Sequence, residues 1–478
     1  MAPTIAPVPK DLKKRFQTPR QEMPAQDPVA RGKNFEEVAL GLQGEAAQLE
    51  AYRCIYCKEP DCVQGCPVGI DIPGFLHEVE KGNFSEALGI LKSTNLLPAI
   101  CGRVCPQEEQ CESLCKTGKS KGNRPVAIGR VERFLADWER AGGIAKPVEI
   151  APPTGKKVAV VGSGPAGLAC AADLAKFGHK VTVLEAFHKP GGVLVYGIPE
   201  FRLPKAIVAQ EISSLEKMGV EIVCNFAVGL TATIEDLQQQ FDAIFVATGA
   251  GLPYFMDLPG ENLGGIYSAN EYLTRVNLMG AFDPEHNDTP VVRGKNVVVV
   301  GGGNVAMDAA RTALRLGAEK VRLVYRRSHD EMPARGEEIE HAEEEGIDFT
   351  LLTTPVRYIG DEKGRVTAVE CRKMELGEPG PDGRRKPVEV VGSEHQYPAD
   401  VVVVSIGNGP NPLVPRTTPG LETKKGKIIA RDASGRTSMK GVFAGGDIVL
   451  GAATVILAMG AGRQAAGSMH EYLQTGVW

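Results

Sequence analysis

The sequence predicts an α/β protein in which a helical, cysteine-rich region is followed by two units of strand, glycine turn, helix and strand. Eight of the 11 cysteines fall between Cys54 and Cys115. Short apolar runs that lead directly into glycine-rich turns occur at residues 158–167 and 297–306, and such runs are typical of buried parallel strands. With 478 residues, the chain is too long for one hydrophobic core, and we expect about two to four domains.

The composition is that of a soluble globular protein, with 43% hydrophobic and 24% charged residues. The net charge of −5 includes no basic excess, so we expect no nucleic-acid partner. No apolar run approaches the roughly 18 residues that a spanning helix requires, and the first residues lack the apolar core of a secretory signal. These features predict a cytoplasmic protein without a membrane-spanning segment.

The first 35 residues are rich in proline and charge and have no sustained apolar period. We expect an extended arm at 1–35, ordered only where another domain or a partner holds it. Residues 36–150 are expected to form a helical domain around the cysteines. The segment KPVEIAPPTGKK, residues 146–157, is rich in proline and lysine and is typical of a linker between domains.

The cysteines form two groups, and each group contains a Cys-Pro pair. Disulfides are not expected in a large intracellular chain, so the crowding of thiols predicts metal binding. Such groups resemble the cysteine runs that bind [4Fe-4S] clusters in bacterial ferredoxins, in which the last cysteine of a run serves the other cluster. Structural zinc is the alternative, because four thiolates also suit a tetrahedral ion. By the ferredoxin rule, the first cluster takes Cys54, Cys57, Cys62 and Cys115, and the second takes Cys66, Cys105 and Cys111.

The first strand–turn–helix unit spans residues 157–185 and contains Gly162, Gly164 and Gly167. The three glycines permit a tight turn, close approach to a pyrophosphate, and close packing of helix on strand. The N-terminus of the helix offers N–H groups to phosphates. Glu185 closes the second strand, where a carboxylate can accept hydrogen bonds from ribose hydroxyls. The unit therefore predicts a dinucleotide site.

The second unit starts at residue 295 and repeats the glycine pattern at Gly301, Gly303 and Ala306. Its second strand ends in Arg326 and Arg327 instead of a carboxylate. Arginine pairs with a 2′-phosphate, whereas a carboxylate accepts from a free 2′-hydroxyl, so this unit predicts NADP(H). Two solvated surface arginines are the alternative. Arg335 is a weaker candidate for the same phosphate.

Three further segments indicate backbone close to a bound cofactor. Gly191 and Gly192 precede Pro199, and the turn at Thr248 and Gly249 follows an apolar strand. Near the end of the chain, Gly446 and Asp447 precede a helix that is rich in small residues. Asp447 can bind a hydroxyl of the cofactor, although an aspartate close to a helix start also serves as a simple cap.

Together these motifs resemble the small (β) subunit of NADPH-dependent glutamate synthase over nearly the whole chain after residue 35. They are also similar to the large subunit of the electron-bifurcating NADH-dependent reduced ferredoxin:NADP oxidoreductase and to the amino-terminal half of dihydropyrimidine dehydrogenase. The segments GGVLVYGIPEFRLPK and GAATVILAMGAGR are closer to the bifurcating subunit. The other segments that carry the resemblance are CIYCKEPDCVQGCP, CGRVCPQEEQCESLC, GSGPAGLACA, GGGNVAMDAARTALRLGA and YRR.

The resemblance implies an α/β fold in which a helical domain with two [4Fe-4S] clusters precedes two Rossmann-like domains, the second inserted into the first. The expected FAD-binding domain covers 155–288 and 400–478, and the expected NADP(H)-binding domain covers 289–399. Arg202 is expected to stabilise negative charge on reduced flavin. The candidate FAD-binding residues are Gly162, Gly164, Pro165, Ala166, Gly167, Glu185, Gly192, Val193, Arg202, Thr248, Gly249, Gly446, Asp447 and Thr454. The candidate NADP(H)-binding residues are Gly301, Gly303, Asn304, Val305, Ala306, Arg326 and Arg327.

The fourth ligand of the second cluster has two candidates. Spacing alone favours Cys101. In dihydropyrimidine dehydrogenase, a glutamine from a helix after the last cysteine completes one cluster, and the matching residue here is Glu132. The resemblance therefore implies Glu132 as the ligand and leaves Cys101 without a cluster.

The activity implied by the resemblance is that of an NADPH:acceptor oxidoreductase subunit that passes electrons between NADP(H), FAD and two clusters. Hydride transfer between stacked rings needs no side-chain acid or base, so we expect no catalytic residue. The expected partner is a larger glutamate synthase subunit or a small flavin and iron–sulfur subunit, with ferredoxin as a further candidate. The alternative is a redox sensor or assembly scaffold that binds nucleotides without turnover.

Overall fold

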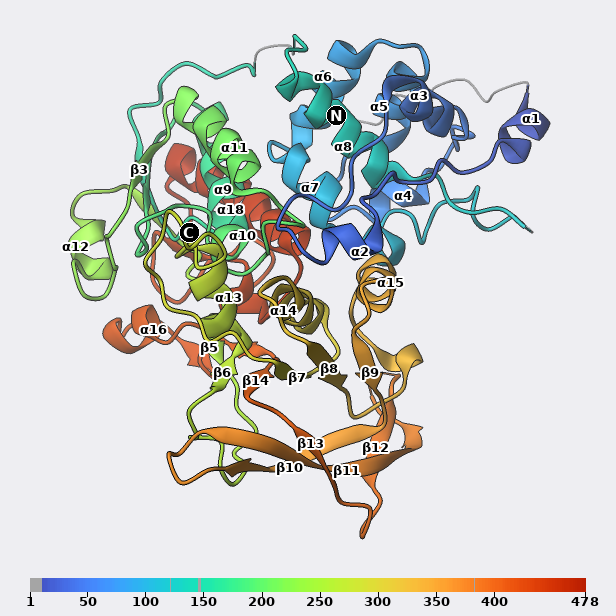
Figure 1. Ribbon diagram of the computed structural model, residues 1–478. Helices are drawn as coiled ribbons and strands as arrows, with labels where there is room; N and C mark the ends of the chain where they lie inside the picture. Colours follow the sequence, from blue (N-terminus) through green and yellow to red (C-terminus); the bar gives the residue numbers. More distant parts are fainter. Residues whose placement is uncertain (1–10, 121, 145–147, 382) are drawn as a thin grey trace.

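The computed structural model describes residues 11–120, 122–144, 148–381 and 383–478. A helical domain stands beside two α/β bodies, and an antiparallel sheet lies at the far end of the second body (Figure 1). Within these described ranges, no helix is both long enough and apolar enough to cross a bilayer.

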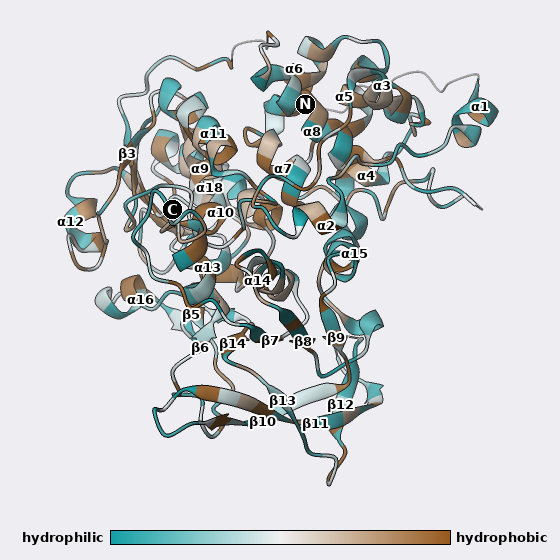
Figure 2. Ribbon diagram, viewed as in Figure 1, coloured by the Kyte–Doolittle hydropathy of each residue, from teal (hydrophilic) through white to brown (hydrophobic). Residues whose placement is uncertain are grey.

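The helical domain surrounds the cysteines with short helices. α5 begins at a side-chain cap, because Asp71 accepts a hydrogen bond from the N–H of Gly74. α8 buries Val131, Phe134 and Leu135, and the polar residues of its last turn lie nearer the surface, so it carries both colours in Figure 2. The helices are α3 (Gly44–Tyr52), α4 (Asp61–Gln64), α5 (Ile72–Glu80), α6 (Phe84–Thr94), α7 (Pro98–Val104) and α8 (Ile128–Arg140).

The expected extended arm contains two short helices where it is described, α1 (Leu12–Gln17) and α2 (Pro28–Arg31). Residues 1–10 lie outside the described part of the chain. Arg15 pairs with Glu80 of the helical domain at 2.7 Å, and Arg31 pairs with Glu345 of the second α/β body at 2.9 Å. Other domains thus hold the arm in place.

The first α/β body is a parallel sheet in the order β18-β4-β1-β2-β3. Its strands are β1 (Lys157–Val161), β2 (Lys180–Leu184), β3 (Glu221–Val223), β4 (Ala243–Val246) and β18 (Val442–Ala444). Its helices are α9 (Pro165–Lys176), α10 (Val193–Tyr196), α11 (Lys205–Lys217), α12 (Ile234–Gln238), α17 (Asp447–Leu450) and α18 (Val455–Thr475). The central strands β1 and β4 are almost wholly apolar and buried, as expected for parallel strands covered on both faces.

The second body is a parallel sheet in the order β6-β14-β7-β8-β9, with a neighbouring antiparallel sheet. Its parallel strands are β6 (Ile266–Ser268), β7 (Asn296–Val300), β8 (Lys320–Val324), β9 (Asp348–Thr350) and β14 (Val401–Val404). The antiparallel strands are β10 (Thr353–Gly360), β11 (Val366–Pro379), β12 (Arg385–Glu389) and β13 (His395–Pro398). Its helices are α13 (Ala269–Asn277), α14 (Asn304–Arg315) and α15 (Gly336–Glu344).

The domain boundaries expected at 288/289 and 399/400 differ from the sheet topology. β6 and β14 both pair within the second sheet, so the second body begins before residue 266 and extends past residue 404. The chain crosses between the bodies where β5 (Leu252–Pro253) pairs with β15 (Asn408–Gly409). It then returns through α16 (Leu413–Thr417), β16 (Thr423–Lys424) and β17 (Lys427–Ile428). The run of four valines at 401–404 fits the centre of either parallel sheet, which is why its pattern could not decide the boundary.

Two glycines of α18 provide a matched test of the packing between α18 and α9. A Cβ at Gly462 would lie 2.2 Å from the carbonyl oxygen of Ala166, whereas a Cβ at Gly467 would meet nothing within 4 Å. We expect Gly462→Ala to lower the free energy of unfolding by about 1–3 kcal/mol through overpacking. Gly467→Ala should be neutral or stabilising by about 0.5–1 kcal/mol. Denaturant unfolding of both variants measures the difference, and equal stabilities would contradict the packing described here.

Candidate functional site

A cavity of about 420 Å³ lies where the helical domain and the two α/β bodies meet. Its wall is formed mainly by the first glycine turn and by the loops after β2 and β4. Val104 and Pro106 enter it from the helical domain, and Asn304, Val305 and Asp308 enter it from α14. The predicted residues that line it are Gly162, Gly164, Pro165, Ala166, Glu185, Gly192, Val193, Arg202, Thr248, Gly249, Asn304, Val305, Asp447 and Thr454.

Two of the three glycines of the first turn, Gly162 and Gly167, occupy positions that a side chain could not. Gly162 has φ +101°, and a Cβ there would lie 2.6 Å from the carbonyl oxygen of Ala247. A Cβ at Gly167 would lie 2.0 Å from the carbonyl oxygen of Gly162, which keeps α9 close to β1. A Cβ at Gly164 would meet no atom within 4 Å, so open space adjoins this backbone. The turn therefore fits a pyrophosphate that approaches the start of α9.

Glu185 lies buried beside this turn. Its carboxylate accepts hydrogen bonds from the N–H of Ser163 at 2.9 Å and the N–H of Phe187 at 2.8 Å. The hydroxyl of Ser163 also donates to it. Glu185 thus fixes the shape of the glycine turn and still forms part of the cavity wall.

Apart from Nε of Arg202, which lies 3.1 Å from Glu338, two polar atoms in the cavity wall have no hydrogen-bond partner among the described residues. They are Oγ1 of Thr248 and Oδ1 of Asp447, and both atoms are buried. Burial raises the pKa of Asp447 to about 6. Since buried polar groups in folded proteins are normally satisfied, these atoms fit a ligand that presents hydroxyl or N–H groups. Gly446 lies outside the wall, and a Cβ there would lie 2.7 Å from the Cβ of Ala166.

The second glycine turn leads into α14 at the edge of the same cavity. Gly301 has φ +145°, and a Cβ there would lie 2.2 Å from the carbonyl oxygen of Ser405. Ala306 is fully buried. Gly301, Gly303 and Ala306 shape the turn without lining the cavity, whereas Asn304 and Val305 line it.

The two arginines after β8 have different environments. Arg326 is exposed. Arg327 is buried, and its Nε–H donates to the carbonyl oxygen of Arg385 at 2.7 Å. Arg335 is also buried and bonds to residues of the helical domain. Of the three arginines considered for a 2′-phosphate, Arg326 is the one with a side chain open to solvent.

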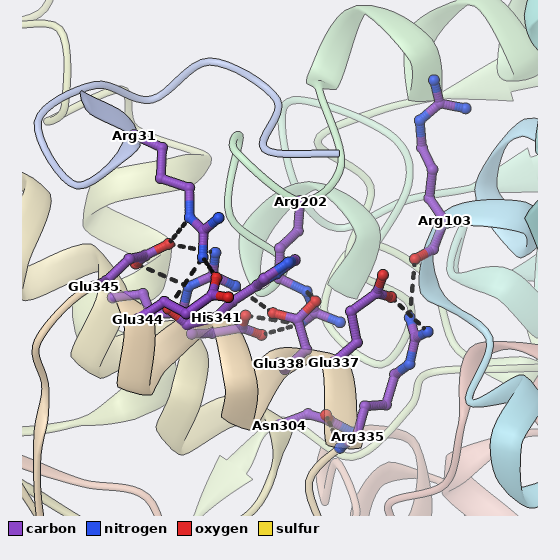
Figure 3. A network of polar contacts seen from close by, with 12 residues as sticks. Arg31, Arg103, Arg202, Asn304, Arg335, Glu337, Glu338, His341, Glu344 and Glu345 are labelled. Carbon is purple, nitrogen blue, oxygen red and sulfur yellow. Dashed lines mark hydrogen bonds and ion pairs between the residues drawn. The ribbon is translucent and has the colours of Figure 1, made fainter. Parts of the chain in front are cut away.

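Arg202 lies in a buried ion network at the cavity wall. It lies 2.7 Å from Asp308 and 3.1 Å from Glu338, and Figure 3 shows Arg202 and Glu338 facing each other. Burial raises the pKa of Asp308 to about 6, although the charge of Arg202 opposes that shift. Burial also opposes ionisation of Glu338, but the charges of Arg202 and Arg311 outweigh it and hold its pKa at about 2. Two carboxylates therefore already surround the Arg202 guanidinium.

The first cysteine group lies together near the surface of the helical domain. Burial, and then the charges of Cys115 and Cys57, raise the pKa of Cys62 to about 12. Burial also raises the pKa of Cys54, and the charges of Cys62, Cys115 and Cys57 add to the effect. Cys54, Cys57, Cys62 and Cys115 thus share one neighbourhood, as the ferredoxin rule requires.

The second cysteine group, Cys66, Cys105 and Cys111, lies close enough to Glu132 for its charge to act on all three thiols. Burial raises the pKa of Cys111, and the charges of Glu112, Cys66 and Glu132 add to the effect. Glu132 is buried, which raises its pKa to about 8, and it accepts a hydrogen bond from Asn95 at 2.7 Å. Cys101 also lies beside this group, because its thiol interacts with that of Cys105. Both candidates for the fourth ligand, Glu132 and Cys101, therefore lie beside the second cysteine group.

No three His, Cys, Asp or Glu side chains in the described ranges converge on a point that could hold a single metal ion.

Sequence reasoning missed the contribution of the helical domain to the cavity. Val104 and Pro106 flank Cys105 and form part of the wall. It also missed Asp308 as the partner of Arg202. For Val104 and Pro106, the available signal was their position beside Cys105, a predicted cluster ligand. For Asp308, the signal was its position four residues after Asn304, on the same face of α14.

Two families of known proteins match the chain. Residues 31–144 match dihydropyrimidine dehydrogenase domain II, 4Fe-4S cluster. Residues 156–465 match pyridine nucleotide-disulphide oxidoreductase.

Individual relatives match over most of the chain. The glutamate synthase [NADPH] small chain of Halomonas elongata is 38% identical over 461 residues, which cover 95% of this chain and 96% of the relative. The NADP(+)-dependent formate dehydrogenase subunit beta of Moorella thermoacetica is 41% identical over 87% of this chain and 60% of the relative. The solved structure of Mycobacterium tuberculosis FprA in complex with NADPH is 23% identical, with a TM-score of 0.54 over 68% of this chain and 84% of that one. This last likeness shows the fold alone.

Proposed function

The chain belongs to the pyridine nucleotide-disulphide oxidoreductase family and joins it to a 4Fe-4S domain of the dihydropyrimidine dehydrogenase type, and we propose that it passes electrons between NADP(H), FAD and two [4Fe-4S] clusters. The observation that carries this proposal is the shared cavity. Residues beside a candidate cluster ligand, the first glycine turn and the second glycine turn all contribute to one wall. Such convergence suits an NADPH:acceptor oxidoreductase subunit.

We assign the FAD site to the first α/β body. The open backbone at Gly164 and the start of α9 would hold the pyrophosphate. Thr248 and Asp447, whose buried oxygens lack partners in the described chain, would bind polar groups of the cofactor. Bound FAD accepts a hydride and gives up single electrons, a chemistry that the protein itself does not supply. The residues of the wall orient the ligands and exclude water.

We assign the cluster ligands to the two cysteine groups of the helical domain. The second group, with Cys66, Cys105 and Cys111, adjoins the cavity, because Cys105 lies between the wall residues Val104 and Pro106. The first group contributes no residue to the wall, and its Cys57 is half-buried. Soft thiolates of this kind suit iron–sulfur clusters. We therefore assign the second group to the inner site and the first group to the outer one.

Two of the relatives that match the chain are named as a small chain and as a subunit beta. We infer that a larger subunit also partners this chain. The candidates are a large glutamate synthase subunit and a small flavin and iron–sulfur subunit, with ferredoxin as the acceptor in the second case. An alternative role as a redox sensor or scaffold does not explain why two glycine turns border one cavity.

Anaerobic addition of NADPH to the purified protein tests this function. We expect the visible absorbance of the flavin to bleach within about a second or less, since kcat values of enzymes are typically about 1–10³ s⁻¹. Stopped-flow absorbance at the flavin bands measures the change. A flavin that stays oxidised under excess NADPH would favour the sensor role. With the co-purified partner present, faster NADPH oxidation on adding glutamine and 2-oxoglutarate identifies the glutamate synthase type, whereas faster NADPH oxidation on adding oxidised ferredoxin and NAD⁺, which are both reduced, identifies the bifurcating type.

Arg326 and Arg327 provide a matched test of NADPH recognition. Arg326 is exposed and Arg327 is bound to the carbonyl oxygen of Arg385, so Arg326 is the better partner for a 2′-phosphate. A charge-assisted hydrogen bond contributes roughly 1.5–3 kcal/mol. We expect Arg326→Ala to raise the KM for NADPH by about tenfold to a hundredfold and to leave the KM for NADH unchanged. Steady-state kinetics with both nucleotides measure this, and a larger loss of discrimination in Arg327→Ala would contradict it.

Glu132 and Cys101 provide a test of the second cluster. We propose Glu132 as its fourth ligand, because a buried carboxylate among thiols needs a compensating partner. Glu132→Ala is expected to lose the iron and sulfide of one cluster, whereas Cys101→Ser should retain both clusters. Iron and acid-labile sulfide assays on anaerobically purified variants measure the outcome. The opposite pattern would assign the ligand to Cys101.

A further inference from the structure

Arg335 reaches out of its own domain into the loop that carries Cys105. It precedes α15 in the second body, and its side chain is only 7% exposed. Its Nη1–H donates to the carbonyl oxygen of Arg103 at 3.1 Å, and its Nη2–H donates to Oε1 of Gln107 at 3.1 Å. Its Nε–H donates to Glu108 at 3.2 Å. Figure 3 shows the side chain of Arg335 extending toward Arg103.

The three acceptors bracket a cluster ligand and part of the cavity wall. Arg103 lies two residues before Cys105, and Gln107 lies two residues after it. Val104 and Pro106, between them, line the cavity. Arg335 therefore holds the loop of residues 103–108 from both sides of Cys105.

The backbone of Arg335 is tied to the second glycine turn. Its N–H donates to Oδ1 of Asn304 at 3.0 Å. Asn304 is the first residue of α14, directly after Gly303, and it lines the same cavity. Arg335 thus connects two sites. Its main chain contacts the proposed nucleotide turn, and its side chain contacts the cysteine loop.

The planar guanidinium is suited to this role. Arginine presents five N–H donors in a rigid fork, whereas lysine offers a single flexible ammonium group. Glu108 and Glu337, at 3.2 and 3.0 Å, compensate the buried charge. The Arg335 guanidinium makes four hydrogen bonds. It therefore has few alternative positions, so a shift at one end of the residue is transmitted to the other.

We propose that Arg335 is a positioning residue that couples nucleotide occupancy at Asn304 to the cysteine loop of residues 103–108. The proposal rests on the function proposed above. A nucleotide that immobilises Asn304 restricts the main chain of Arg335, and the guanidinium then restricts the loop around Cys105. Binding of the electron donor is thereby linked to the geometry of the inner cluster site.

Hydrogen–deuterium exchange of the cofactor-loaded protein, with and without NADP⁺, tests this coupling. In the wild type we expect NADP⁺ to slow amide exchange both at residues 303–306 and at residues 103–110. The effect on the second segment should be about fivefold or more, the lower end of typical coupling between sites. In Arg335→Ala the NADP⁺ effect should remain at 303–306 and disappear at 103–110. Arg335→Lys should restore it in part.

Two further variants keep the test decisive. Arg357→Ala removes an exposed ion pair with Glu370 in the same body and should retain the full NADP⁺ effect. If Arg335→Ala does not retain FAD and iron, Glu108→Gln replaces it, because the Glu108 side chain is 38% exposed and its loss of charge is better tolerated. The NADP⁺ effect at 103–110 should then fall.

The outcomes separate failure of the coupling from failure of the nucleotide assignment. Protection at 303–306 without protection at 103–110 in the wild type overturns the coupling alone. Unchanged protection at 103–110 in Arg335→Ala, or in Glu108→Gln where that variant is used, also overturns it. Absence of protection at 303–306 in the wild type overturns the nucleotide assignment, and the coupling with it.

Discussion

The arrangement of the molecule depends on buried charges that must be paired where its parts meet. Glu345 is the centre of this joint, and its side chain is fully buried. It accepts from Arg311 and Arg315 of α14 and from Arg31 of the arm, and the ring of Phe201 lies under Arg315 at 3.9 Å. Removing one partner of a buried ion pair is strongly destabilising. The arm, α14 and the end of α15 therefore cannot shift separately without leaving a charge unpaired.

This joint also orients the cavity. Asn304 and Asp308 are four residues apart on α14, so their side chains lie on one face of the helix. Asp308 pairs with Arg202 of the first body at 2.7 Å. That pair turns the face of α14 toward the first glycine turn, and Asn304 and Val305 consequently line the same cavity as Gly162 and Gly164. The ion pair between the bodies thus brings the two glycine turns to one space.

The sequence predicted the α/β fold class, the family and the cofactor types, and the comparisons confirm them. These features depend on local patterns of glycine, cysteine and apolar residues. The ion pairs were not predictable, because Arg335 and Glu108, or Arg202 and Asp308, lie more than a hundred residues apart and one arginine resembles another in a sequence. The different environments of Arg326 and Arg327 could have been predicted from the sequence, since successive residues after a strand tend to face opposite sides.

The ion network also changes the electrostatic interpretation of the cavity. Arg202 was expected to stabilise negative charge on the flavin, but Asp308 and Glu338 already lie beside its guanidinium. The pKa of Glu338 is held at about 2, so it stays ionised and compensates that cation at neutral pH. Positive potential facing the cavity must then come mainly from the N-termini of α9, α14 and α18, whose first residues line it. Unpaired N–H groups at a helix start attract anions without a charged side chain. Their attraction therefore does not depend on the protonation of a side chain.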